Sequence, residues 1–511
     1  MIRYNLLLLF FLSLSTGTFA QNKFWVFLKD KNGSTDDTRE YLSKKAIERR
    51  KKINYPIGHY SDLPIQEKYI NAIIEIGVKI SGKSRWLNAI CCYGDYEQIE
   101  YIKTLPFVSY ISINNFQTQI SAINHQTDDN LIEQQLSSME GDYFTNNKFT
   151  GKSIRIAVID AGFIGANESP VLQHLYDNKQ VLKTWDFHTN KENVYKSSNH
   201  GTAVLSCIAG NNKGQLLGLA QNAEFLLART ERNLVENQSE EENWLMAIEW
   251  ADANGVDIIN TSLGYTADEY FPSEMDGKTS IISRAANLAA SKGILIICAA
   301  GNSGDGDWKF IGTPADADSV FSVGGIDPET NLHTEFSSYG PTADLRLKPN
   351  AVAFGHVHAY SANSGVHHTQ GTSFSSPLIA GFAACLWEKY PNESNMEIFN
   401  KLEKCSSLYP YYDYAHGYGI PKASYFFERI EKDTSFHIID ENNIIKIKVL
   451  NFNKEGCSEP MYMHVSDDRG TLEHYEVIKI YQQIPYVFQK ENYTNKTLRF
   501  FYKGFINEIK I

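Results

Sequence analysis

Between residues 150 and 430 the chain alternates short apolar stretches with longer ones whose apolar residues recur at helical spacing. The apolar stretches are IRIAVI (154–159), AEFLLAR (223–229), VDIINTSL (256–263), GILIICAA (293–300) and SVFSVGG (319–325). The helical stretches include GTAVLSCIAG (201–210), NWLMAIEWADANG (243–255) and SIISRAANLAASKG (280–293). Strands that are apolar throughout are buried on both faces, and alternation with helices favours parallel pairing. The pattern predicts an α/β fold, a mostly parallel sheet with helices on both faces.

The two flanking regions follow different patterns. Residues 21 to about 120 combine strand-like stretches such as KFWVFLKD with the charged helical stretch DDTREYLSKKAIERRKK, which predicts a small α+β unit. The polar stretch 125–142 is typical of a linker with a short helix. Beyond about 430 the pattern is β-rich and the helical stretches stop. We therefore expect an N-terminal domain with linker over 21–135, the α/β domain over 140–428 and a small β-rich domain over 433–511.

The first twenty residues have the three parts of a secretory signal peptide. A basic residue, Arg3, precedes an apolar run from Leu6 to Leu14, and the small residue Ala20 ends the stretch. The run is too short to span a bilayer, and no later stretch approaches about 20 continuous apolar residues. We expect cleavage near Ala20, export from the cytoplasm to an extracellular, periplasmic or cell-surface location, and no transmembrane segment.

The charge and the cysteine content argue against two classes of protein, nucleic-acid-binding proteins and disulfide-rich scaffolds. The 511-residue chain has a formal net charge of −12, which argues against a nucleic-acid-binding protein, because such proteins carry a basic surface. Its seven cysteines are sparse and odd in number, unlike a disulfide framework. Three of them lie in apolar stretches, where we expect buried small hydrophobic side chains, although a disulfide stays open after export: Cys207, Cys298 and Cys385.

The stretch IRIAVIDAGFIG (154–165) could begin a dinucleotide-binding unit, in which a strand leads into G-x-G-x-x-G. Gly162 and Gly165 occupy the second and third glycine positions, and Asp186 partly fits the ribose-binding acid. The first glycine position, however, holds Asp160. A carboxylate there would repel a pyrophosphate and block its close approach, so we regard Asp160 as a functional group in its own right.

Three further polar residues occur at similar strand-to-helix junctions. His200 begins the stretch HGTAV, Asn302 follows a strand in AAGNSG, and Ser373 lies in GTSFSSP before an apolar helix. The carboxyl ends of parallel strands meet at one edge of a sheet, where ligands bind. One carboxylate, one imidazole, one hydroxyl and one amide are the groups that acyl transfer by a serine nucleophile requires.

These motifs closely resemble those of the subtilisin family of serine proteases. IAVIDAGF, HGTAV and GTSFSSP match its Asp, His and Ser motifs in the same chain order, AAGNSG matches its oxyanion-hole segment, and INTSLG matches its substrate-binding strand. The resemblance, which covers about 140–428, implies an Asp160–His200–Ser373 triad with an acyl-enzyme intermediate. It also implies Asn302 as oxyanion donor and Ser262, Leu263 and Gly264 as substrate-binding residues. The family usually has Ser or Thr after the aspartate, where this chain has Ala161.

The same resemblance implies a secreted serine endopeptidase acting on polypeptides, with the N-terminal unit as a removable prodomain that aids folding and inhibits. The chemistry would need no cofactor or metal. Structural calcium is common in the family and stays open here; Asp305-Gly306-Asp307 offers oxygen ligands but is more typical of a plain turn. The alternative function is a secreted binding or adhesion protein on a degenerate protease scaffold, for which Ala161 is the only indication.

An acidic stretch, ENQSEEE (236–242), lies between the strand AEFLLAR and the helix NWLMAIEWA. In subtilisins this connection lines the subsites two and four residues before the cut, so the carboxylates could favour Lys or Arg in the substrate. A purely structural interpretation is also open. Ser239 and Glu242 have the spacing of a capping box, and acids are favoured in the first turn of a helix.

Overall fold

The computed structural model describes residues 22–34, 40–113, 131–231, 240–266, 270–428, 433–450, 452, 458–468, 472–481 and 485–511. The chain forms two compact units. The smaller unit comprises residues up to Ser34 together with Pro64–Asn114, and the larger comprises Thr35–Leu63 together with Asn115–Ile511. Among the described helices, none has the length and apolar character needed to cross a bilayer.

The smaller unit is an antiparallel sheet with two helices, as the α+β pattern predicts. Its strands, in spatial order, are β2 (Lys79–Ser84), β3 (Ala89–Gly94), β1 (Asn22–Leu28) and β4 (Val108–Ile113). Its helices are α2 (Glu67–Ile74) and α3 (Tyr96–Lys103). Asp95 and Gln98 form a capping box that fixes the start of α3. Apolar residues of β1, β3 and both helices share one core.

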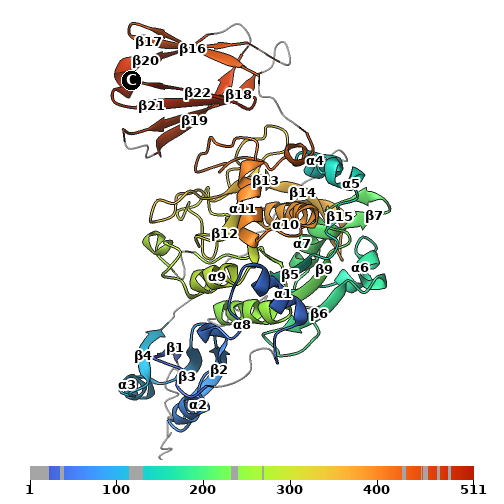
Figure 1. The fold of residues 1–511 in the computed structure, drawn as a ribbon, viewed down its shortest axis with the longest axis vertical. Helices are drawn as coiled ribbons and strands as arrows, with labels where there is room; N and C mark the ends of the chain where they lie inside the picture. Colours follow the sequence, from blue (N-terminus) through green and yellow to red (C-terminus); the bar gives the residue numbers. More distant parts are fainter. Residues whose placement is uncertain are drawn as a thin grey trace, which may run out of the picture. The chain divides into compact units, whose positions relative to one another are not determined.

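A seven-stranded parallel sheet forms the centre of the larger unit (Figure 1). In spatial order its strands are β13 (Ala351–Phe354), β12 (Val320–Ile326), β11 (Leu295–Ala299), β10 (Ile258–Thr261), β5 (Arg155–Asp160), β9 (Glu224–Arg229) and β6 (Val181–Asp186). All six pairings are parallel. The predicted α/β fold with a mostly parallel sheet is therefore confirmed.

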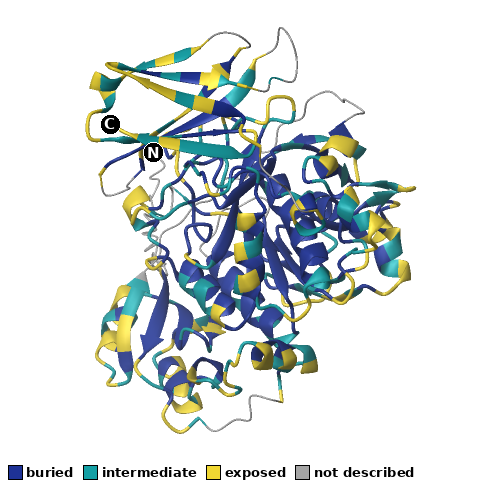
Figure 2. Cartoon of the chain, turned by 45° about the horizontal axis from the view of Figure 1, so that its top comes forward, coloured by how far each residue is buried: buried dark blue, intermediate teal, exposed yellow. Residues whose placement is uncertain are grey.

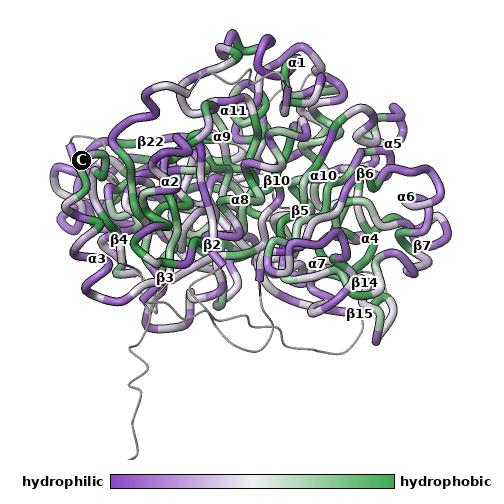
Figure 3. The backbone as a smooth tube through the Cα atoms, turned by 90° about the horizontal axis from the view of Figure 1, so that it is seen from below, coloured by the Kyte–Doolittle hydropathy of each residue, from purple (hydrophilic) through white to green (hydrophobic). Residues whose placement is uncertain are grey.

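Two pairs of helices cover the sheet. α7 (His200–Ala209) packs against α10 (Thr372–Lys389), and α8 (Glu240–Ala253) packs against α9 (Ile281–Ser291). Ile156 and Val158 of β5 share the core of α7 and α10, so the alternate residues Ala157 and Ile159 face the other side. Figure 2 shows the central strands of this unit in dark blue, as buried, and Figure 3 shows β5, β10 and α10 in the interior of the tube drawing.

Smaller elements complete this region. Four further α-helices belong to it: α4 (Leu131–Ser137), α5 (Asp142–Asn146), α6 (Gln173–Asp177) and α11 (Asn395–Lys404). Two hairpins are present: β7 (Asn211–Asn212) with β8 (Gln215–Leu216), and β14 (His356–Ser361) with β15 (Gly365–Gln370). Leu131, Leu136 and Met139 belong to the main core. The region that we interpreted as linker thus already contributes core residues at 131, ahead of the predicted domain start at 140.

Residues 40–63 pack with the larger unit, although they precede most of the smaller one in sequence. Their helix α1 (Lys44–Lys52) begins at the N-cap Ser43, whose backbone N–H also donates to Ala253 O at 2.8 Å. Arg49 and Arg50 of α1 are buried and both form ion pairs with Asp252 at the end of α8. Two arginines of the charged helical stretch therefore form an internal contact.

The C-terminal residues form two antiparallel sheets that share a core. One sheet consists of β16 (Phe436–Glu441), β17 (Ile444–Val449) and β20 (Tyr486–Gln489), and the other of β19 (Leu472–Ile480), β18 (Glu459–Ser466), β21 (Thr497–Tyr502) and β22 (Phe505–Lys510). Phe436, Ile447 and Phe500 are among the fully buried residues between them. This agrees with the β-rich pattern of the sequence.

Three cysteines predicted to be buried are indeed buried and form no disulfide within the described residues: Cys207, Cys298 and Cys385. Burial raises the pKa of the Cys207 thiol to about 12, so this side chain is a neutral thiol at physiological pH. Cys457 and the predicted signal peptide lie outside the described residues.

Candidate active site

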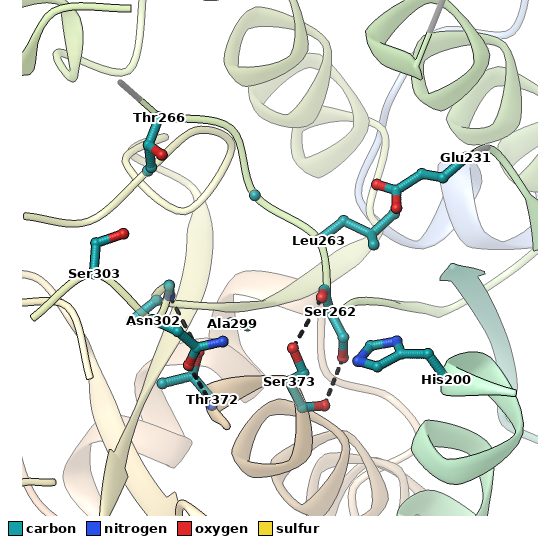
Figure 4. Close-up of a pocket in the computed structure, with 14 residues that line it drawn as sticks. His200, Glu231, Ser262, Leu263, Thr266, Ala299, Asn302, Ser303, Thr372 and Ser373 are labelled. Atoms are coloured by element: carbon teal, nitrogen blue, oxygen red, sulfur yellow. Dashed lines mark hydrogen bonds between the residues drawn. The ribbon is translucent and has the colours of Figure 1, made fainter. Parts of the chain in front are cut away.

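The four polar residues singled out in the sequence come from neighbouring elements at one edge of the parallel sheet. Asp160 is the last residue of β5, His200 the first of α7, and Ser373 lies in the first turn of α10. Asn302 follows β11. His200, Asn302 and Ser373 line one cavity, and Figure 4 shows their side chains around its floor.

Asp160 and His200 are joined by a hydrogen bond of 2.8 Å between the Asp160 Oδ1 and the His200 Nδ1. Asp160 is fully buried, and the side chain of His200 is 13% exposed. Gly201 allows this close approach, because a Cβ at that position would lie 2.6 Å from Gly162 O and 3.0 Å from the Asp160 Cβ. The bond fixes the ring with its other nitrogen, Nε2, directed away from the carboxylate.

Two opposing effects act on the pKa of His200. Burial, the larger single effect, lowers it, but the charge of Asp160 and the hydrogen bond to it together outweigh burial and raise the pKa above its usual value. The carboxylate therefore stabilises the imidazolium form. A histidine held in this way can accept a proton and keep it while another bond forms or breaks.

The second carboxylate oxygen of Asp160 has no hydrogen-bond partner among the described residues, although it is buried. Oδ1 accepts both the His200 ring and the Ala161 backbone N–H, the latter at 2.8 Å. Ala161 occupies the position where the family usually has a hydroxyl residue, and its side chain cannot donate. The alanine at position 161 thus leaves the Asp160 Oδ2 without a hydrogen-bond donor among the described residues, while the hydrogen bond between Asp160 and His200 is present.

Ser373 is positioned by Gly371, the N-cap of α10, whose φ of 135° is a backbone angle that favours glycine. Its hydroxyl donates to Ser262 O at 3.2 Å, and the Ser262 hydroxyl donates back to Ser373 O at 2.8 Å. No hydrogen bond joins Ser373 to His200 in this structure, although both line the same cavity. In this structure the Ser373 hydroxyl is bonded to Ser262 instead.

Asn302 is oriented by Thr372, the residue before Ser373. The Asn302 Oδ1 accepts the Thr372 backbone N–H at 2.9 Å and the Thr372 hydroxyl at 3.0 Å. These donors assign the oxygen to that side, so the Asn302 amide nitrogen faces the cavity (Figure 4). Thr372 was not singled out in the sequence, although it belongs to the GTSFSSP motif.

Ser262, Leu263 and Gly264 line the same cavity. They follow the end of β10 and are not themselves part of a described strand. Beyond them, Tyr265 forms an isolated antiparallel bridge with Thr313. The segment therefore borders the cavity between the end of β10 and this bridge.

Glu231 is a cavity residue that the sequence analysis missed. It lies two residues beyond β9, is only 4% exposed, and lines the cavity together with His200. Like Asp160, it is an acidic residue just after an apolar strand, and that position could have identified it. β9 lies next to β5 in the sheet and ends at the same edge.

Asp186, the candidate ribose-binding acid of the sequence, lies in a network of buried hydrogen bonds. Asp186 is fully buried and accepts hydrogen bonds from Arg229, at 2.8 Å, and the Thr189 hydroxyl, at 2.7 Å, so it is a structural anchor. Burial raises its pKa, but the bonds from Lys196, Thr189 and Arg229 outweigh this and lower it to about 2. With Asp160 bonded to His200, nothing in this turn supports a dinucleotide site.

Two further predictions from the sequence concern a calcium-binding turn and the acidic stretch 236–242. Asp305-Gly306-Asp307 lies in a turn, and the described residues contain no cluster of three or more His, Cys, Asp or Glu side chains able to hold a metal. In the acidic stretch, Glu240, Glu241 and Glu242 form the buried first turn of α8. Glu236 and Ser239 lie outside the described residues, so the capping box stays a prediction.

A parallel sheet with Asp, His, Ser and Asn at its carboxyl edge defines a class of serine hydrolases, and comparison with known proteins identifies the family. The model of the subtilase family (peptidase S8) matches residues 151–419, more than half of the chain. The model of the peptidase S8 propeptide domain of Bacteroidota matches residues 23–130. The chain belongs to the subtilase family and is a subtilisin-like serine peptidase with an N-terminal propeptide domain.

Individual relatives support this assignment. The chain is 26% identical to subtilisin NAT of Bacillus subtilis subsp. natto over 345 residues, which cover 66% of this chain and 80% of that protein. It is 30% identical to subtilisin DY of Bacillus licheniformis over 264 residues, 51% of this chain and 85% of that one. Fervidolysin from Fervidobacterium pennivorans, a keratinolytic enzyme related to subtilisin, has a similar fold, with a TM-score of 0.57 at 16% identity, over 95% of this chain and 71% of its own.

Proposed function

We propose that this subtilase is an exported endopeptidase in which Asp160, His200 and Ser373 form the catalytic triad. The observation that carries the proposal is the 2.8 Å bond between Asp160 and His200 beside a cavity that also holds Ser373 and Asn302. An endopeptidase needs a cleft that accepts an extended chain, and the proposal assigns that role to the cavity bordered by Ser262, Leu263 and Gly264.

The first step of the proposed mechanism is attack by the Ser373 oxygen on the scissile carbonyl carbon. The Ser373 hydroxyl leaves Ser262 O and donates to the His200 Nε2, which takes its proton as the new C–O bond forms. Asp160 holds the ring and stabilises the imidazolium. His200 then returns the proton to the leaving amine, the C–N bond breaks, and an acyl-enzyme remains for hydrolysis by water.

Negative charge develops on the carbonyl oxygen of the substrate during this attack. The Asn302 amide nitrogen faces the cavity because Thr372 holds its oxygen. The Ser373 backbone N–H lies in the first turn of α10, where helix N–H groups lack helical partners. We assign these two groups as the oxyanion donors, a form of stabilisation that is among the largest contributions in acyl transfer. Each step uses protein groups only, which leaves calcium a structural role.

The export and propeptide parts of the proposal rest on separate observations. The first twenty residues have the signal-peptide pattern, and residues 23–130 match a peptidase S8 propeptide domain. We propose that this domain aids folding, inhibits the peptidase and is removed by the triad itself. N-terminal sequencing tests this: the active protein should start beyond residue 130, whereas Ser373→Ala should start after Ala20 and retain the propeptide. Active protein that still carries residues 23–130 would contradict it.

Labelling with a fluorophosphonate probe tests the triad, because the probe reacts only with an activated serine. The mature protein should be labelled, and Ser373→Ala should not. Ser375→Ala is the matched control: its hydroxyl is buried in the same helix and donates to Phe354 O at 3.0 Å, so labelling should persist. Absence of labelling in the mature protein would favour the alternative, a binding protein on a degenerate protease scaffold.

A further inference from the structure

Glu231 contributes an acidic side chain to the wall of the active-site cavity. The backbone N–H of the preceding Thr230 donates to Asp160 O at 3.0 Å, which fixes this loop against the end of β5. Glu231 is 96% buried, since only 4% of it is exposed, and it lines the cavity with His200 and Leu263. Figure 4 shows its carboxyl group beside Leu263, on the His200 side of Ser373.

Within the described residues, no hydrogen bond or ion pair reaches the Glu231 carboxyl group. Arg229, the cation that acts on it electrostatically, donates to Asp186 and to Ala161 O instead. Burial, followed by the charges of Glu240 on α8 and Asp160 on β5, raises the pKa of Glu231 well above its usual range, and Arg229 opposes this only in part. Glu231 is thus largely shielded from water and has no cation bonded to it among the described residues, so its ionised form is costly. Such a group beside a cleft is suited to a ligand that brings the missing cation.

The two walls of the cavity determine which substrate side chain meets Glu231. Ala299, Asn302, Ser303 and Thr266 line one side, and His200, Leu263 and Glu231 line the other (Figure 4). Successive side chains of an extended chain point in opposite directions. If the residue whose carbonyl is attacked directs its side chain toward the Asn302 side, the residue before it faces His200 and Glu231.

We propose that Glu231 makes the subsite beside His200 selective for lysine or arginine in the residue preceding the one that is cleaved. The inference rests on the proposed function, because it places the scissile carbonyl at Ser373. The long apolar stem of Lys or Arg would pass His200 and Leu263, and its charged end would pair with the Glu231 carboxylate. When the carboxyl group is protonated in the free enzyme, binding of the cation releases its proton to solvent. A neutral polar side chain could exchange a hydrogen bond with the carboxyl group but would bring no opposite charge to it.

Two matched peptides test the proposal on the mature enzyme. They differ only in the residue before the cleaved one, which is lysine or the uncharged norleucine of similar length. We expect kcat/KM to be on the order of 10²-fold higher for the lysine peptide, in the range measured for buried charge pairs. In Glu231→Gln, which keeps shape and removes the charge, this ratio should fall to about fivefold or less. Glu168→Gln removes an exposed carboxylate outside the cavity and should leave the ratio unchanged.

Measuring the lysine preference at low and high salt distinguishes a pair with Glu231 from a general attraction of cationic peptides to the negatively charged protein. The lysine preference should persist at high ionic strength, because a pair buried in the cleft is screened much less than surface charges. A wild-type enzyme that cleaves both peptides equally, or a ratio that Glu231→Gln does not change, would overturn the inference and leave the proposed function intact. A wild-type enzyme that cleaves neither peptide and resists the fluorophosphonate probe would overturn the proposed function instead.

Discussion

Asp62 and Lys292 form an ion pair of 2.7 Å in which both side chains are fully buried, although 230 residues separate them in sequence. Arg50 donates to the same carboxylate at 2.6 Å and also pairs with Asp252 at the end of α8. Burial raises the pKa of Asp62, but its bonds and charge interactions with Arg50 and Lys292 outweigh this and lower it. Residues 40–63, which belong to the matched propeptide region, are thus tied to the catalytic unit by buried charges.

Removing one partner of this cluster should strongly destabilise the uncleaved protein. Asp62→Asn leaves Arg50 and Lys292 buried without their shared anion, so we expect the free energy of unfolding to fall by about 3–5 kcal/mol. Denaturant unfolding at pH 7 in the Ser373→Ala background measures this. The control is Glu48→Gln, because its pair with Lys44 is 3.8 Å long and largely exposed, and should contribute about 0.5 kcal/mol or less. Equal effects of both variants would contradict the prediction.

The proposed oxyanion donor predicts a specific kinetic loss. Asn302→Ala should lower kcat by about 10²–10³-fold with little change in KM, a magnitude borrowed from the equivalent change in subtilisin, because the amide binds charge that exists only in the transition state. Ser373→Ala should cost about 10⁶-fold, again borrowed from subtilisin. Steady-state peptide hydrolysis measures both. Asn147→Ala removes an exposed amide outside the cavity and should have no effect; an equally inert Asn302→Ala would exclude the assignment.

The unsatisfied oxygen of Asp160 predicts that a hydroxyl at position 161 is stabilising. In Ala161→Ser the new hydroxyl can donate to the buried Asp160 Oδ2, which has no partner among the described residues. We expect the free energy of unfolding to rise by about 1.5–3 kcal/mol, the range for a hydrogen bond to a charged group. Ala166→Ser is the control, since this alanine is also fully buried but packs in an apolar core, where a hydroxyl should destabilise. A loss of stability in Ala161→Ser would show that the hydroxyl does not reach the carboxylate.

The raised pKa of His200 sets the pH dependence of activity. His200 must be neutral to accept the Ser373 proton, so kcat/KM should fall as pH decreases through a pKa above the usual value of about 6.5. In Asp160→Asn the charge that raises this pKa is absent, so the acidic limb should move to lower pH, and the rate should drop by about 10⁴-fold. A pH–rate profile of both proteins measures the limb. An unchanged limb in Asp160→Asn would mean that the titrating group is not His200.

The sequence was sufficient to predict the parallel sheet and the grouping of Asp160, His200, Ser373 and Asn302 because both depend on local patterns. An apolar strand followed by a turn and a helix can be recognised within about 15 residues, and strand ends meet at one sheet edge by geometry. Glu231 follows the same rule but belongs to no familiar motif, so nothing distinguished it from a surface acid.

The buried charges could not be predicted in the same way. Arg49 and Arg50 lie in a charged stretch whose pattern is that of a solvated helix, and Asp62 follows ten residues after its end. The partners Asp252 and Lys292 lie about 200 residues later. Such charges are buried only because they neutralise one another. No pattern within a single stretch contains that information, so the docking of residues 40–63 needed the structure.

The C-terminal β-rich region is joined to the catalytic region by aromatic contacts. Tyr411 is fully buried among Leu408, Tyr462 and Phe501, and its hydroxyl donates to Met463 O at 3.1 Å. His464 of β18 packs against the Tyr411 ring, with 5.5 Å between ring centroids. Although residues 433–511 have a core of their own, this shared cluster leads us to expect that the two regions unfold together.

His464 should make this junction sensitive to acid. Burial, assisted by the charge of Arg499, lowers its pKa to about 4, and neither ring nitrogen has a hydrogen-bond partner among the described residues. The unfolded chain therefore takes up a proton at about pH 6.5, whereas the folded chain does so only near pH 4. Stability is then lost progressively as pH falls from 6.5 to 4, by up to about 3 kcal/mol.

The variant His464→Phe keeps an aromatic ring at the junction and removes the titration. We expect unfolding free energies measured between pH 7 and 4 to fall more steeply for the parent than for His464→Phe, with the difference accumulating below pH 6.5. His333 serves as the internal comparison, because burial also lowers its pKa to about 4 and its contribution is common to both proteins. If the two curves stay parallel over this range, the protonation of His464 does not weaken the junction, and the acid sensitivity of the protein arises elsewhere.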